Sequence, residues 1–221
     1  MINLCIPTLC RYDLLAQCIS SALEGSLRPT QINIIDNGGK FRDHFGDIKE
    51  IDGVPLDLFV PKKNIGVTSS FNHFAHKYDD YTIVCNDDIK FHNKTIELMV
   101  KAAQDNPNEI FFTGDGYWEH AFSLFLQKKD MLSLIGEYDP NFENYFSDRD
   151  MIYRMSLRGY KPFIVKRATY EHVDGGSQTV RSGEPETKSV SERFNLSGKY
   201  YEMKWAGICG MEQVDKAFGI L

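Results

Sequence analysis

The sequence predicts an α/β fold with a mostly parallel central sheet flanked by helices. In the first half of the chain, short apolar runs rich in β-branched residues alternate with stretches of helical periodicity. Such alternation favours parallel strands joined by right-handed crossovers. Each early run ends in small or polar residues. These ends would meet at one edge of the sheet, which is where ligands bind in open α/β folds.

The first half contains four expected strands. They are Ile2–Ile6, Gln31–Ile35, Leu56–Val60 and Tyr81–Cys85. Apolar residues at helical spacing from Leu14 to Gly25 and from Phe71 to Tyr78 predict the helices before the second and fourth strands.

The second half predicts shorter elements and a small antiparallel part. Helices are expected at Lys94–Asp105 with Asn93 as its cap, at Asp130–Ile135, and from Asp148 to Gly159. Strands are expected at Ile110–Thr113, Ala121–Gln127 and Pro162–Val165, and the alternation in the second favours an antiparallel strand. Residues 174–188 are rich in Gly, Ser, Thr and Glu and predict a mobile loop, either a lid or a linker. The aromatic tail, residues 189–221, is expected to pack back as helices.

The composition is that of an ordinary globular protein. The chain has 221 residues, of which 42% are hydrophobic and 25% charged, and this length fits one large domain. A net charge of −6 argues against non-specific nucleic-acid binding. No apolar run approaches a membrane span and no signal peptide precedes Met1, so no transmembrane segment is expected. Five cysteines without CxxC spacing predict reduced thiols and a cytoplasmic location.

Two adjacent carboxylates, Asp87 and Asp88, follow the apolar run Tyr81–Cys85. Charge at the end of a buried strand is costly unless it is paired or bound to a metal. Carboxylate oxygens are the ligands that Mg²⁺ or Mn²⁺ takes when it is shared with substrate phosphates. A solvated turn is the alternative, because Asp and Asn are common turn formers.

The residues behind the first two strands resemble motifs of the family 2 glycosyltransferases. Pro7 and Thr8, with Arg11, are similar to that family's first strand and nucleotide loop. Asp36 and Asn37 look like its second-strand motif, whose Asp typically meets the nucleotide base. The resemblance covers roughly residues 2–177 and implies the glycosyltransferase-A fold. The tail resembles short single-domain members, some of which are virus-encoded.

Further motifs extend the resemblance in the same order. Asn64 and Gly66, with Asn72, are similar to the Asn-x-Gly…Asn stretch beside the ribose and diphosphate. Asn86-Asp87-Asp88 resembles the metal-binding Asp-x-Asp motif with Asn in place of its first Asp. The resemblance therefore implies Asp88 as the metal ligand and Asp87 as a nucleotide contact. Residues 1–92 would form the nucleotide-sugar-binding half.

The catalytic and acceptor half is expected over residues 93–177. Ser147-Asp148-Arg149-Asp150 resembles the Glu-Asp-x-Asp segment, with Ser in place of Glu, and implies Asp148 as the catalytic base. Asp150 and Trp118 are expected on the acceptor side, and His172 would complete the metal site.

Each residue also has a plainer interpretation. Asp36 could cap a turn, Asn64 and Asn72 could be loop or cap residues, and Asp148 could be a helix N-cap. His172 could be a surface histidine and Trp118 a core residue.

The resemblance implies a metal-dependent inverting transferase that moves a hexose from a nucleotide-diphospho-sugar, with UDP the expected nucleotide, to a glycan or other hydroxyl acceptor. Mn²⁺ or Mg²⁺ would neutralise the leaving diphosphate, and a carboxylate would take the acceptor proton. One alternative is a sugar nucleotidyltransferase, although residues 7–13 hold one basic residue where that class has a basic Gly-rich loop. The other is a non-catalytic module that binds nucleotide-sugar or glycan.

Overall fold

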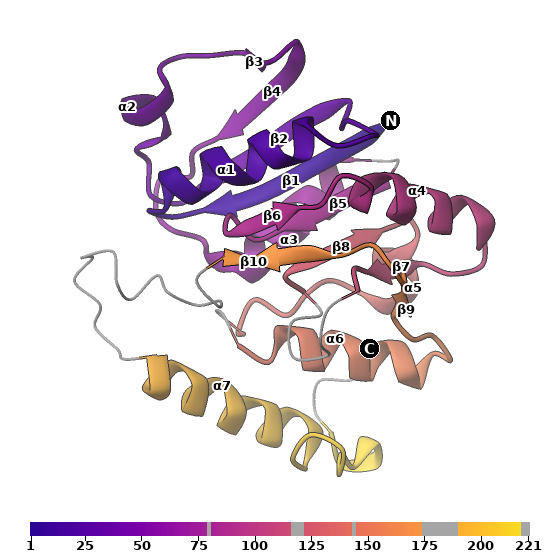
Figure 1. Cartoon of the computed structure of the whole chain (residues 1–221). Helices are drawn as coiled ribbons and strands as arrows, with labels where there is room; N and C mark the ends of the chain where they lie inside the picture. The colour runs from indigo at the N-terminus through magenta and orange to yellow at the C-terminus, as the bar shows by residue number, and fades with distance from the viewer. Residues whose placement is uncertain (79–80, 116–121, 143–144, 174–189, 218–221) are drawn as a thin grey trace.

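The computed structural model describes residues 1–78, 81–115, 122–142, 145–173 and 190–217 (Figure 1). A central eight-stranded sheet has the order β3-β4-β2-β1-β5-β8-β7-β9. Its strands are β1 (Ile2–Thr8), β2 (Gln31–Asp36), β3 (Glu50–Ile51), β4 (Val54–Phe59), β5 (Tyr81–Cys85), β7 (Phe111–Thr113), β8 (Leu124–Gln127) and β9 (Phe163–Ile164). A separate antiparallel pair joins β6 (Ile89–Phe91) to β10 (Tyr170–His172).

The parallel part of the sheet places its polar strand ends at one edge. β1 pairs in parallel with both β2 and β5, and β2 pairs in parallel with β4. Thr8 at the end of β1 is in register with Asp36 at the end of β2. β8 is antiparallel to both β5 and β7. The sheet is therefore mixed but mainly parallel, as the sequence predicts.

Helices cover both faces of the sheet (Figure 1). On one face, α1 (Tyr12–Leu23) and α4 (Thr95–Asp105) share an apolar core with alternate residues of β1, such as Leu4 and Ile6, and α4 packs on β7. The opposite face, which carries Cys5 of the same strand, is covered by α3 (Gly66–Lys77), α5 (Met131–Ile135) and α6 (Ser147–Leu157). This alternation follows from the two-residue period of a strand, which sends successive side chains to opposite faces.

A last long helix, α7 (Val190–Trp205), lies against α6 on the side away from the sheet (Figure 1). Phe142, Tyr201 and Trp205 form a small apolar cluster between them. The remaining elements are α2 (Phe41–Phe45) and the short 3-10 helix η4 (Val214–Lys216). Among the described residues, every helix is too short or too polar to cross a membrane.

Several expected boundaries differ from those observed. Asn93 is not the cap of α4, because Lys94 occupies that position and no side chain caps the helix. α6 begins at Ser147, and its N-cap position is Phe146 rather than Asp148. The predicted strand over Ala121–Gln127 is observed over Leu124–Gln127. The expected loop at 174–188 lies outside the described residues, so its lid or linker role stays a prediction.

Candidate active site

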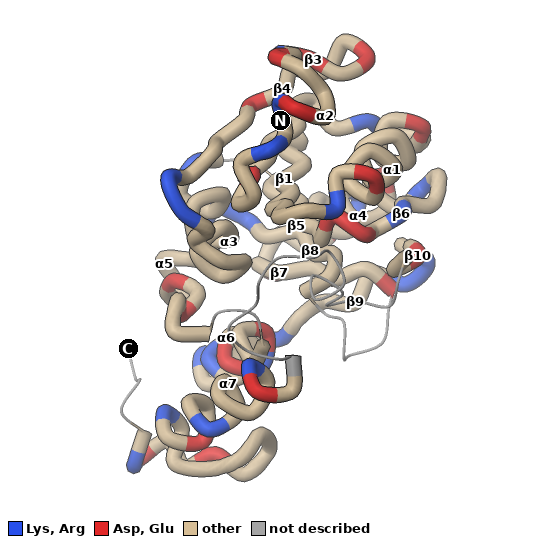
Figure 2. The backbone as a smooth tube through the Cα atoms, turned by 90° about the vertical axis from the view of Figure 1, so that its left-hand side faces the viewer, with Lys and Arg blue, Asp and Glu red and all other residues tan. Residues whose placement is uncertain are grey.

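A pocket opens at the edge of the sheet where β1, β2 and β5 end, with a volume of about 200 Å³. Its walls come from the loops after these strands, the start of α3, and α7. Figure 2 views the molecule from this side and shows acidic and basic residues interspersed along the chain. The pocket is lined by Pro7, Thr8, Leu9, Cys10, Arg11, Leu14, Asn37, Asn64, Gly66, Val67, Asn86, Asp87, Asp88 and Arg193.

Asp87 faces Thr8 across the ends of two neighbouring strands. The Thr8 hydroxyl donates a hydrogen bond of 2.6 Å to Asp87 Oδ2. Burial raises the pKa of Asp87 to about 7, against the lowering effect of this hydrogen bond, and the charge of Asp88 adds to the rise. A positive charge bound in the pocket would favour the ionised carboxylate.

Asp88 and His172 are brought together by backbone pairing. β10 runs antiparallel to β6, with His172 opposite Ile89, and the Val173 amide donates to the Asp88 carbonyl oxygen. His172 Nε2 consequently lies 2.9 Å from Asp88 Oδ1, and each side chain is 12% exposed. The plainer interpretation of His172 as a surface histidine does not fit this burial.

This pair has the donor atoms that a shared divalent cation requires. Mg²⁺ usually takes one or two carboxylates from the protein and completes its shell with water and substrate phosphates, and Mn²⁺ also prefers carboxylate oxygen, with imidazole the less suited ligand. Within the described residues there is no group of three or more His, Cys, Asp or Glu side chains that could hold a metal alone. Asp88 and His172 together offer two ligand side chains, which fits an ion shared with a phosphate ligand.

Asn37 and Asn64 line the pocket and also shape its loops. Asn37 Oδ1 accepts from the Ile65 amide at 3.0 Å, and Asn64 Oδ1 accepts from the Gly66 amide at 2.8 Å. Gly66 has a φ of 76°, a left-handed conformation that favours glycine at the start of α3. The two asparagines fix the wall that follows β2 and precedes α3.

Asp36 does not reach the pocket, contrary to its expected contact with a nucleotide base. It is fully buried, and Oδ1 accepts hydrogen bonds from the Tyr12 hydroxyl and the amides of Gly38 and Gly39. Oδ2 accepts from the Phe41 amide at 2.8 Å. Because all of these hydrogen bonds come from the chain itself, the Asp36 carboxylate stabilises the turn after β2. This agrees with the alternative interpretation, in which Asp36 caps a turn.

Asn72 is also outside the pocket lining. Its Oδ1 accepts from the Tyr138 amide and its Nδ2 donates to the Tyr138 carbonyl oxygen, both at 2.8 Å. The side chain therefore holds α3 to the turn after α5. The contact with ribose or diphosphate that the resemblance implies for Asn72 stays a prediction, and the hydrogen bonds observed for its amide are those to Tyr138.

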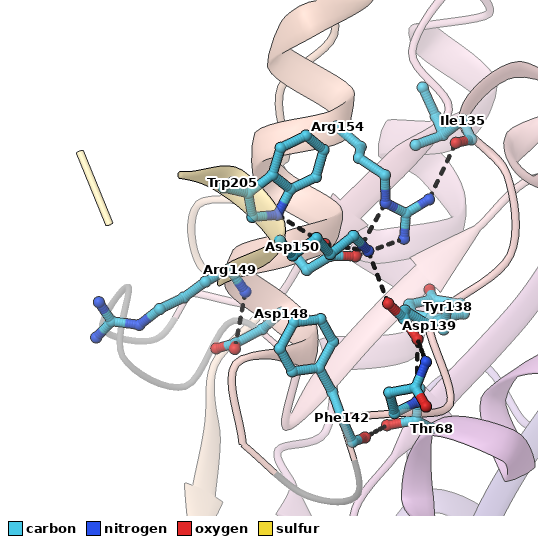
Figure 3. Close-up of polar contacts among 12 residues, drawn as sticks. Thr68, Ile135, Tyr138, Asp139, Phe142, Asp148, Arg149, Asp150, Arg154 and Trp205 are labelled. Carbon is cyan, nitrogen blue, oxygen red and sulfur yellow. Dashed lines mark hydrogen bonds and ion pairs between the residues drawn. The ribbon is translucent and has the colours of Figure 1, made fainter. Parts of the chain in front are cut away.

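Asp148 lies in the first turn of α6 and is partly exposed. Its Oδ1 accepts from the Arg149 amide at 2.8 Å. Phe146 occupies the N-cap position, so Asp148 is not the N-cap residue of α6, although its carboxylate accepts from one amide of the first turn. Figure 3 shows its carboxylate apart from the bonded cluster around Asp150.

Asp150 is not available to an acceptor, because it is fully buried. Its Oδ1 accepts from Trp205 Nε1 at 2.9 Å and lies 2.7 Å from Lys204 Nζ (Figure 3). Its Oδ2 accepts from Arg154 Nε at 2.9 Å. The acceptor role expected for Asp150 is therefore wrong, and its role is to join α6 to α7. Trp118, the other expected acceptor residue, lies outside the described residues.

One charged residue of the pocket lining is not predicted by the sequence motifs. Arg193 belongs to α7, yet its side chain lines the pocket with Arg11 and Asp88. Nothing in the motif order points to it, because it follows the last family motif. The N-terminal end of α7 lies on the side of the molecule where the strands end (Figure 1), and Arg193 adds a second guanidinium to the pocket lining.

Solved structures with a similar fold were found at low sequence identity. The mannosyltransferase PcManGT from Pyrobaculum calidifontis, in complex with GDP-Man and Mn²⁺, has a TM-score of 0.60 at 12% identity. The alignment covers 78% of this chain and 57% of that enzyme, so this chain spans just over half of its length. Residues 1–349 of TarS from S. aureus, in complex with UDP, give 0.63 at 8% identity and cover 93% of this chain and 72% of the other.

No curated protein matches the chain. The sequence profile of one family, described as glycosyl transferase family 2, does match it, over residues 4–161. That segment runs from within β1 to just beyond the end of α6 and includes every residue of the pocket lining except Arg193. Since the match spans well over half of the chain and the neighbours have the glycosyltransferase-A fold, the chain belongs to glycosyl transferase family 2.

Proposed function

We propose that the chain transfers a hexosyl group from a nucleotide-diphospho-sugar to a hydroxyl acceptor with inversion at the anomeric carbon. The observation that carries this proposal is Asp88 after β5, which lines the pocket together with Arg11 and Arg193 and is contacted by His172 of β10. A pocket lined by carboxylate and guanidinium groups, with an imidazole next to one carboxylate, suits a ligand that brings both a cation and phosphates. Family membership supports the same class of donor.

The donor would enter at the ends of β1 and β2. Thr8, Asn37 and Asn64 line the side of the pocket proposed for the nucleoside, and Asp87 is proposed to meet the ribose. UDP is the proposed nucleotide. GDP should be tested beside it, because one structural neighbour is in complex with GDP-Man. Arg11 and Arg193 would bind the diphosphate, for which guanidinium groups are well suited.

Asp88 and His172 are the proposed ligands of Mn²⁺ or Mg²⁺. When bound, such an ion neutralises the charge that develops on the departing diphosphate. Pairing of β6 with β10 holds His172 next to Asp88, so the two side chains would hold the ion at a fixed place in the site.

Asp148 is the proposed general base. The acceptor hydroxyl oxygen bonds to the anomeric carbon as the bond from that carbon to the diphosphate oxygen breaks, and Asp148 takes the hydroxyl proton. The nucleoside diphosphate leaves with the electron pair of the broken bond. One displacement from the face opposite the leaving group inverts the configuration. The acceptor class proposed is a glycan or another hydroxyl compound.

Product analysis tests this function against its two rivals. The protein is incubated with Mn²⁺ and UDP-glucose, UDP-N-acetylglucosamine or GDP-mannose, with water and simple sugars as acceptors. Release of nucleoside diphosphate supports a transferase, whereas release of pyrophosphate from a nucleoside triphosphate and sugar phosphate would support a nucleotidyltransferase. Saturable binding without either product would support a binding module.

A matched pair of variants tests the metal ligands without depending on turnover. Asp88→Asn should abolish the Mn²⁺-dependent part of UDP or GDP binding measured by calorimetry, because the amide lacks the ligand charge. Glu171→Gln is the control, since Glu171 lies beside His172 in β10 but is exposed and pairs with Lys90. Unchanged Mn²⁺ dependence in Asp88→Asn would contradict the proposed site.

A further inference from the structure

Phe146 has a backbone conformation that its side chain does not favour. Its φ is 66°, in the left-handed region, and it occupies the N-cap position of α6. A bulky residue rarely adopts this conformation, and does so only where its surroundings determine it strongly. Residues held in this way cluster at functional sites. The contacts of the Phe146 ring should therefore explain what holds it.

The ring rests on a glycine in the middle of α7. A Cβ atom at Gly198 would lie 3.2 Å from Phe146 Cζ and 3.4 Å from Cε2, which is closer than the ring tolerates without moving. Phe194 and Tyr201 lie on either side of Gly198 along α7 and also contact the Phe146 ring, with ring centroids 5.1 Å and 5.6 Å from its centroid. Glycine inside a helix is unfavourable, and close approach of another group is a reason for it to occur there.

The first turn of α6 depends on this residue. The Phe146 carbonyl oxygen accepts the Asp150 amide at 2.9 Å, which is a hydrogen bond of that turn. The Arg149 guanidinium lies over the Phe146 ring, 5.3 Å from its centroid, and the Arg149 amide donates to Asp148 Oδ1. A rotation about the Phe146 backbone would therefore turn the whole first turn and move the Asp148 carboxylate with it.

We propose that Phe146 is a positioning residue: its ring, seated on Gly198 of α7, fixes the first turn of α6 and thereby holds the Asp148 carboxylate in place for proton transfer. This inference rests on the proposed function, in which Asp148 is the base. It gives α7 a role in the reaction beyond the contribution of Arg193 to the donor pocket. Ordinary packing, the alternative, would affect stability alone.

Gly198→Ala separates the two roles. Replacing a helix-interior glycine by alanine favours the helix, so the melting temperature should stay equal or rise unless the contact with Phe146 outweighs that gain. The added methyl group displaces the ring, and with it Asp148. Misplacement of a catalytic group by a fraction of an ångström is expected to lower kcat about tenfold, with donor KM within about twofold. Asn195→Ala, an exposed change in the same helix, is the control and should leave kcat unchanged.

A second variant tests the contact itself. Phe146→Leu removes the distal ring atoms that the new methyl group would meet, so Gly198→Ala should have little further effect on kcat in that background. Equal losses from Gly198→Ala in both backgrounds would overturn the inference, because the effect would then not pass through the ring.

The amide signal of Arg149 gives a readout that does not require turnover. Its hydrogen bond to Asp148 Oδ1 makes its ¹H–¹⁵N shift sensitive to the position of that carboxylate. We expect the signal to move in Gly198→Ala and to stay in Asn195→Ala. Wild-type kcat together with an unmoved signal in Gly198→Ala would overturn the inference. If the wild-type protein turns over none of the nucleotide-sugars, the proposed function fails, and an Arg149 signal that moves still supports the positioning contact.

Discussion

Replacement of Lys204 by methionine should destabilise the attachment of α7 strongly, because this lysine joins two buried carboxylates. Lys204 Nζ lies 2.8 Å from Asp139 Oδ2 and 2.7 Å from Asp150 Oδ1, and its side chain is 5% exposed. Removing one partner of a buried ion pair typically costs about 3–5 kcal/mol, because the remaining charge stays buried. Asp150 keeps Arg154 and Trp205 as partners, so we expect a loss of about 3 kcal/mol at neutral pH.

The size of this loss should depend on pH through Asp139. Burial alone would raise the pKa of Asp139, but hydrogen bonds from Lys204, the Asn141 amide and Tyr200 hold it below its ordinary value. In the wild-type protein, this carboxylate therefore contributes stability above the unfolded-state pKa of about 3.9, and the contribution is lost as the pH falls through the lower folded-state pKa. Without Lys204, burial dominates and the pKa rises. Protonation then relieves the buried charge, so the deficit of Lys204→Met should shrink as the pH falls from 7 towards 4.

Urea unfolding followed by tryptophan fluorescence at pH 7 and pH 4.5 measures both effects, and Trp205 lies within the affected contact. Lys101→Met is the control, because Lys101 is exposed and pairs with a single carboxylate one helical turn away, for which the expected loss is under about 1 kcal/mol. Adding Asp139→Asn to Lys204→Met should recover part of the loss at pH 7. A loss below about 1 kcal/mol in Lys204→Met, or a loss independent of pH, would refute this reasoning.

Two further predictions concern the pocket and the proposed base. Asp148→Asn should lower turnover by roughly 10²–10⁴-fold, while the melting temperature and donor affinity should stay close to wild type because Asp148 is not the N-cap residue of α6. Near wild-type turnover would exclude Asp148 as the base. Arg193→Gln should weaken UDP or GDP binding by about 10- to 100-fold, which corresponds to the loss of about 1.5–3 kcal/mol for a hydrogen bond to a charged group. Lys199→Gln, an exposed change in the same helix, should leave the affinity unchanged. Equal affinities of the two variants in calorimetry would contradict a diphosphate contact of Arg193.

The sheet and its ligand edge could be predicted because strand formation follows from local apolar runs. Tyr81–Cys85 is buried over most of its length, and the carboxylates that follow it line the pocket. The roles of Asp36 and Asn72 could not be predicted in the same way. Both are polar residues in the order expected for a nucleotide site. In the structure, however, the Asp36 carboxylate accepts hydrogen bonds from backbone amides, and the Asn72 side chain is hydrogen-bonded to Tyr138. Whether a polar side chain faces a ligand or its own chain depends on loop geometry, which a motif does not encode.

The C-terminal helix shows where hydrophobic pattern itself misleads. Counted over the whole residue, Met203 is 64% exposed while its neighbour Lys204 is 4% exposed, the reverse of what their side chains predict. The inversion follows from partners distant in sequence: Asp139 and Asp150 offer Lys204 two buried charges, and a buried lysine is tolerated when it is paired. The same helix face carries Trp205, which donates to Asp150. α7 is therefore held by charge and hydrogen bonding as well as by apolar burial. Hydrogen bonds and ion pairs are directional, so they fix the orientation of α7 relative to α6. A fixed orientation keeps Arg193 at the pocket and Gly198 against Phe146.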